Sequence, residues 1–113
     1  MPITASISPG QRAALTLVRW RVFLVADNWH VVAWCKEGKE GRVTSPIQKF
    51  DADRSLTLTR SGRVYHLSGP PGDDGDADYT WHRWQHALGI RETRDITLAV
   101  LRAIQGAAPG KTA

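Results

Sequence analysis

Residues 17–36 read LVRWRVFLVADNWHVVAWCK, and this stretch decides the fold. Its first half has a period of two, typical of a half-buried β-strand, in which the residues of one face are Val18, Trp20, Val22 and Leu24. Asp27 and Asn28 tolerate a positive φ, so they predict a two-residue hairpin turn. The return segment, Trp29 to Lys36, is apolar on both faces, which predicts a central strand with something packed on each side.

Further strands are expected on the C-terminal side of this hairpin. Residues 42–50 form a third strand that Pro46 interrupts, so this strand lies at an edge or is bulged there. Residues 56–60 and 63–67 alternate around Ser61-Gly62, which predicts a second hairpin. Five short strands joined by short turns predict a five-stranded antiparallel β-meander.

The apolar period changes near the C-terminus. Trp81, Trp84 and Leu88 are spaced as on one helix face, with Asp78 or Thr80 as the cap and Gly89 at the end. A second helix is expected from Thr93 or Asp95 to a C′ glycine at Gly106, with an apolar stripe made of Ile96, Val100, Leu101 and Ile104. We therefore expect an α+β fold in which two C-terminal helices pack on one face of the meander.

The length of 113 residues suits one domain, which we place at residues 11–106 between a flexible N-terminal lead (1–10) and a flexible tail (107–113). No apolar run approaches the roughly 20 residues of a membrane-spanning helix, and no cleavable signal is recognisable. The chain has a single cysteine, which is compatible with a reducing compartment. We expect a cytoplasmic location.

The net charge of +4 is unevenly distributed. Residues 73–78 carry four aspartates and no base, whereas residues 1–72 carry ten Lys or Arg against five acids. Alternating aspartates suit a calcium loop, but Tyr79 and Gln85 stand where an EF-hand needs Gly and Glu. We therefore interpret this segment as an acidic loop in a basic domain, with no specific cation.

Catalytic patterns are weak in this sequence. His82 and His86 share a helix face, but Arg83 replaces the glutamate of a zinc-hydrolase helix. Cys35 is expected to be buried and inert on the central strand. Residues 106–112 imitate a phosphate-binding loop, yet only three residues separate the glycines and no helix can follow. We expect no enzymatic activity, no cofactor and no metal.

Aromatic residues beside basic ones are the remaining functional feature. Five residues are the candidate binding set: Arg19, Arg21, Trp34, Arg60 and Arg63. Such a surface resembles the composition of protein interfaces, so the leading hypothesis is a small non-enzymatic domain that binds a protein. The Pro46 strand offers an edge for a partner strand or for self-association. Replacing Arg21 and Arg63 by Glu is then expected to abolish binding and to leave the thermal midpoint nearly unchanged.

Two other functions remain open. The same surface could bind single-stranded nucleic acid, with the arginines on phosphates and the rings under bases. A metal-dependent enzyme built on His82 and His86 is the third hypothesis.

Overall fold

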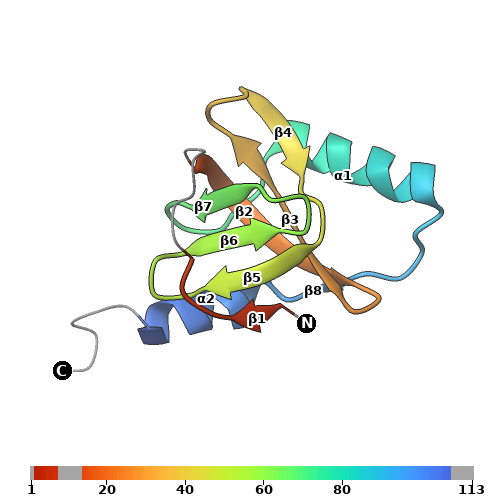
Figure 1. The fold of residues 1–113 in the computed structure, drawn as a ribbon. Coiled ribbons are helices and arrows are strands. Elements are labelled where there is room, and N and C mark those ends of the chain that lie inside the picture. The colour runs from red at the N-terminus through yellow and green to blue at the C-terminus, as the bar shows by residue number, and fades with distance from the viewer. Residues whose placement is uncertain (1, 8–13, 108–113) are drawn as a thin grey trace.

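A computed structural model of the chain describes residues 2–7 and 14–107 (Figure 1). The fold is α+β, as expected, with a mixed sheet and two helices. The elements in chain order are β1 (Ile3–Thr4), β2 (Leu15–Val25), β3 (Asn28–Cys35), β4 (Glu40–Val43), β5 (Ile47–Asp51), β6 (Leu56–Thr59), β7 (Val64–Leu67), α1 (Gly75–Leu88), β8 (Arg94–Asp95) and α2 (Thr97–Ala107).

The predicted first hairpin is present as β2 and β3, but a bulge breaks its alternation. The pairing passes from Val18 opposite Trp34 to Arg21 opposite Val32, so two residues of β2 face one of β3. Arg19 adopts a φ of 48° there. The bulge is the reason that Leu17 and Trp20 share one core although they are three positions apart. The turn is Ala26-Asp27, one position earlier than predicted, because Val25 pairs with Asn28.

The prediction for the return strand is confirmed, because β3 is covered on both faces. Val31, Ala33 and Cys35 belong to the main core. Val32, on the opposite face, belongs to a second cluster beneath α1. Cys35 is completely buried, as expected for a thiol on this strand.

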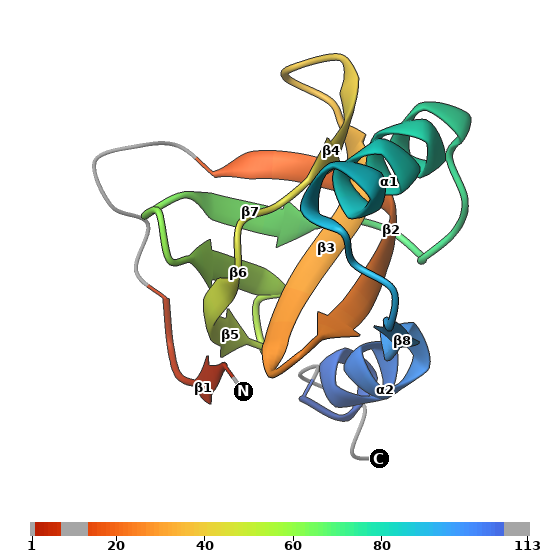
Figure 2. The same ribbon diagram turned by 90° about the vertical axis from the view of Figure 1, so that its right-hand side faces the viewer.

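The expected third strand is two strands, and the five-stranded antiparallel meander is wrong. In the described part of the chain the sheet has eight strands, in the order β1-β5-β6-β7-β2-β3-β4 with β8 on β2, and the β1/β5 and β2/β7 pairs are parallel. Pro46 separates β4, which pairs with β3, from β5, which pairs with β6 and β1. The sheet curls, as Figure 2 shows. The ring centroids of Trp29 in β3 and Phe50 in β5 lie 5.5 Å apart.

The described part of the expected N-terminal lead is more structured than predicted. Within the expected N-terminal lead, β1 pairs with β5 and Ile7 is buried. Positions 1 and 8–10 of that lead and positions 108–113 of the tail lie outside the described residues.

The expected hairpin around Ser61-Gly62 is confirmed by the antiparallel pairing of β6 with β7.

The helices begin and end differently from the prediction. The N-cap of α1 is Asp74 rather than Asp78 or Thr80, so part of the acidic segment forms the first helical turn. Gly89 ends α1, as predicted, and its conformation there is left-handed. Gly106 lies inside α2, and Leu88 is 59% exposed instead of buried.

The two helices do not share one face. Ala77 and Trp81 of α1 pack on the second cluster with Phe23 and Val32. Val100 of α2 packs in the main core, and the rest of the predicted stripe is partly buried against it. The helices lie apart in Figure 2, with α1 beside β3 and β4 and α2 beside the β8 end of β2.

Candidate functional site

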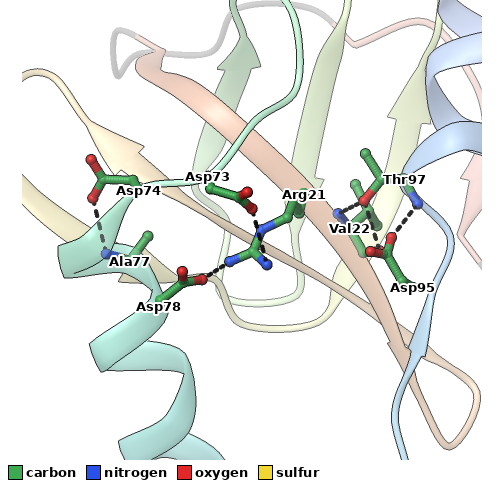
Figure 3. A network of polar contacts seen from close by, with 8 residues as sticks. All are labelled: Arg21, Val22, Asp73, Asp74, Ala77, Asp78, Asp95 and Thr97. Atoms are coloured by element: carbon green, nitrogen blue, oxygen red, sulfur yellow. Dashed lines mark hydrogen bonds and ion pairs between the residues drawn. The ribbon is translucent and has the colours of Figure 1, made fainter.

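Two of the candidate arginines, Arg19 and Arg21, form ion pairs with the acidic segment, residues 73–78. Arg21 is paired with Asp78 through Nη2, and its Nη1 lies 3.4 Å from Asp73 (Figure 3). The Arg21 side chain is only 19% exposed, and its guanidinium lies 5.4 Å from the ring centroid of Phe23. The arginine therefore anchors the start of α1 to β2.

Asp74 connects the bulge of β2 to the helix. One carboxylate oxygen accepts from the backbone N–H of Ala77 at 3.0 Å, which caps α1. The other accepts from Arg19 Nη2 at 3.0 Å and from Arg19 Nε at 3.2 Å. The acidic segment thus supplies a helix cap and the counter-charges of two arginines.

Helix α1 covers the sheet face on which the binding surface was expected. The Trp81 ring stacks on Phe23 at 4.7 Å, and the Trp84 ring tilts against His30 at 4.8 Å. Gly41 of β4 allows this close approach, because an added Cβ would lie 2.3–2.4 Å from backbone atoms of Asp76 and Ala77. The tryptophans of α1 therefore hold the helix on the sheet.

Of the other candidates, Trp34 lies beside this contact, because it pairs with Gly41 of β4, whereas Arg60 and Arg63 are held by other residues. Arg60 donates from Nη2 to Asn28 Oδ1 at 3.2 Å, at the first residue of β3. Trp34, which is half-buried, stands six positions farther along β3, or about 20 Å at ~3.3 Å per residue. Arg63 is half-buried after the β6–β7 turn, where its N–H donates to Thr59 Oγ1. The five candidate residues thus do not form one continuous surface.

His30 is a buried titratable group that the sequence did not single out. Its Nδ1 lies 2.8 Å from the Thr44 carbonyl, which fits an N–H donor in the neutral ring. Burial lowers the pKa of His30, the hydrogen bond to Thr44 opposes that effect, and the nearby charge of Arg60 adds to it. The ring is 5% exposed beneath Trp84, so it is a packing element between β3 and α1.

In the described part of the chain, no third metal ligand lies with His82 and His86. Within residues 2–7 and 14–107, no group of three or more His, Cys, Asp or Glu side chains is placed to hold an ion. His82 and His86 are both exposed on α1. The end of the segment that imitates a phosphate-binding loop, from 108 onward, lies outside the described residues.

The outer face of α1 carries a surface that the sequence reasoning missed. An open hollow of about 350 Å³ is lined by Tyr79, His82, Arg83, His86 and Ala87. Tyr79 is 63% exposed, and the Arg83 guanidinium lies 5.7 Å from its ring centroid. The spacing of four between Tyr79 and Arg83 and of three between Arg83 and His86 is the signal that could have found it. We call these five residues the α1 outer face.

This face has a single sign of charge. None of its five residues is acidic, and Asp76 and Asp78 stand in the first turn of α1. A second hollow of about 280 Å³ near the β2–β3 turn is lined by Glu92 and Arg94 with Leu24, Ala26 and Thr93, so its charges are mixed. The α1 outer face is therefore the aromatic and cationic hollow of the two.

Comparisons with family models, curated proteins and solved structures found no match for this chain. In the described part of the chain, neither helix has the length and apolar character needed to cross a membrane. The functional interpretation therefore rests on the geometry.

Proposed function

We propose that this protein is a small non-enzymatic domain that binds an acidic segment of another protein through the α1 outer face. The observation that supports the proposal is the exposed Tyr79 ring under the Arg83 guanidinium, in a hollow without carboxylates. Tyrosine and arginine are enriched among the residues that carry binding energy at protein interfaces. The proposal keeps the expected kind of partner and moves the contact from the sheet to the helix.

The arrangement favours an acidic partner that also carries apolar side chains. Arg83 would attract carboxylates, and the hollow beside Ala87 and Tyr79 would take an aliphatic or aromatic side chain. The binding energy then comes from a few residues on a rigid helix, which Trp81 and Trp84 hold in place from the other side.

The proposal is tested by fluorescence anisotropy with a labelled peptide that alternates Glu and Leu, with a Lys–Leu peptide as control. The double variant Tyr79→Ala/Arg83→Ala is expected to weaken binding of the acidic peptide at least tenfold. Arg102→Ala, which removes an exposed arginine of α2, is the matched control and should bind as the wild type does. Equal affinity of the double variant and the control would refute the proposed surface.

Binding of single-stranded nucleic acid remains the alternative, and the same assay separates it. A labelled oligothymidylate bound through phosphates would show an affinity that falls steeply with salt, with a slope set by the number of contacts. Arg60→Ala and Arg63→Ala would then weaken binding, while Tyr79→Ala/Arg83→Ala would leave it unchanged.

A further inference from the structure

The exposed side of α1 carries an acidic residue near one end and a basic residue near the other. Asp76, Tyr79 and Arg83 are spaced by three and four residues, so their side chains form one stripe along the helix. Tyr79 is 63% exposed, and Asp76 and Arg83 are exposed as well. Trp81 faces the opposite way, into the second cluster, so the stripe lies on the side of α1 that is turned away from the sheet. Figure 2 shows α1 on the outside of the sheet.

The charges of this stripe are unpaired within the described part of the chain. Asp78, in the same helical turn, is held by Arg21. Neither Asp76 nor Arg83 takes part in an ion pair there, and the Arg83 guanidinium lies 5.7 Å from the centroid of the Tyr79 ring. The stripe therefore presents a free carboxylate and a free guanidinium on either side of an exposed aromatic ring.

The spacing makes the stripe complementary to itself. Asp76 precedes Tyr79 by three residues and Arg83 follows it by four, which is about 4.5 and 6 Å along the axis of an α-helix. A two-fold axis beside Tyr79 therefore brings Asp76 of each copy opposite Arg83 of the other. A two-fold interface uses the same patch on both copies, and this antiparallel arrangement also sets the helix dipoles against each other favourably.

We propose that two copies of the chain pair through their α1 helices, antiparallel, with an ion pair between Asp76 and Arg83 on each side of a two-fold axis at Tyr79. The charge complementarity of the stripe with itself favours a second copy as the occupant. The dimer shares the surface of the proposed function and does not depend on it. One consequence does rest on the proposed function, because an acidic partner that binds Arg83 has to displace the second copy.

The self-association that the sequence predicts at the Pro46 strand is thus proposed at α1 instead. The strand after Pro46, β5, is paired on both sides, with β1 and β6. The strand before it, β4, lies against α1 through Gly41.

Charge reversal with rescue tests the pairing by sedimentation equilibrium. One helix pair buries less area than a standard interface, so the wild type should be monomeric at about 1 µM and dimeric near 1 mM. Asp76→Arg and Arg83→Asp each place like charges opposite one another, and each should weaken the dimer at least tenfold. An equimolar mixture of the two variants has opposite charges at both contacts, so it should form a heterodimer nearly as stable as the wild-type dimer.

Matched variants keep the result interpretable. Arg102→Asp makes the same change of charge on an exposed position of α2 and should dimerise as the wild type does. Asp76→Asn and Arg83→Gln introduce no opposite charge and should each weaken the dimer at least threefold, which preserves the test if a charge-reversed chain does not fold. A wild type that stays monomeric at about 1 mM, or α1 variants that dimerise as Arg102→Asp does, would overturn the proposal.

The labelled Glu–Leu peptide separates this inference from the proposed function. At saturation the peptide is expected to convert the dimer into peptide-bound monomers. A dimer that the peptide neither binds nor dissociates would refute the proposed function and leave the pairing intact. A protein that binds the peptide but stays monomeric without it would refute the pairing alone.

Discussion

Arg21 is expected to stabilise the fold rather than to bind a partner, and Arg21→Met tests this. The methionine keeps most of the apolar stem and removes the guanidinium that pairs with Asp78 and Asp73. A hydrogen bond to a charged group contributes about 1.5–3 kcal/mol to stability. The pair with Asp73, whose side chain is 81% exposed, adds at most about 1 kcal/mol.

Two smaller effects act in opposite directions. The contact of the guanidinium with the Phe23 ring contributes about 0.5–1 kcal/mol. The buried Nε of Arg21 has no acceptor among the described residues, which reduces the net gain. We therefore expect Arg21→Met to lower the free energy of unfolding by about 2–3 kcal/mol, which for a domain of this size lowers Tm by about 10 °C.

The assay is urea unfolding followed by tryptophan fluorescence, with Arg19→Met as the matched control. Arg19 is 50% exposed in its pair with Asp74, so its loss should cost less than about 1 kcal/mol. Contrary to the expectation from the sequence, we expect the double replacement of Arg21 and Arg63 by Glu to lower the thermal midpoint, because the new carboxylate at position 21 would face Asp73 and Asp78. A loss below about 0.5 kcal/mol for Arg21→Met would refute the anchoring role.

Three further predictions concern the contact between α1 and the sheet. Burial lowers the pKa of His30 in the folded state, so as the pH falls the His30 ring takes up its proton in the unfolded chain before it does so in the folded protein. Stability should therefore fall as pH drops below about 6.5 and level off below the folded-state pKa. His30→Asn should flatten urea midpoints between pH 7.5 and 5, and equal slopes for variant and wild type would contradict this. Gly41→Ala should lower the free energy of unfolding by about 1–3 kcal/mol, because the new Cβ would collide with the backbone of α1. Gly75→Ala is the control for thermal unfolding, since open space surrounds Gly75 and the fold should not be destabilised. Asp74→Ala should cost about 1 kcal/mol in urea unfolding through the lost cap, and an unchanged midpoint would argue against the cap.

The strands of the first hairpin were predictable because their signals are local. Neighbouring residues alone show the alternation along β2 and the apolar content of both faces of β3. The bulge at Arg19 changes which residues of β2 point to the core, but it does not end the strand. The parallel pairing of β2 with β7 was not predictable in this way. It joins residues about 50 positions apart, and no local period reports which strands become neighbours.

The ion pairs of the candidate arginines Arg19 and Arg21 were not predictable for a related reason. The sequence separates the basic segment of β2 from the four aspartates by more than 50 residues, so both appeared to be exposed charge. The fold brings Arg21 to Asp78 and places α1 over the same face. A helix start at Asp74 would have been the useful signal, because it turns the acidic loop into a first helical turn that favours negative charge.

The central claim, that the α1 outer face is the binding surface, is tested most directly by an amide proton–nitrogen correlation spectrum of the labelled protein. The spectrum is titrated with the acidic Glu–Leu peptide. The account predicts shifts confined to residues 79–87, with Arg60 and Arg63 unchanged. Shifts that cluster at Arg60 and Arg63, or a spectrum that does not change at millimolar peptide, would contradict it.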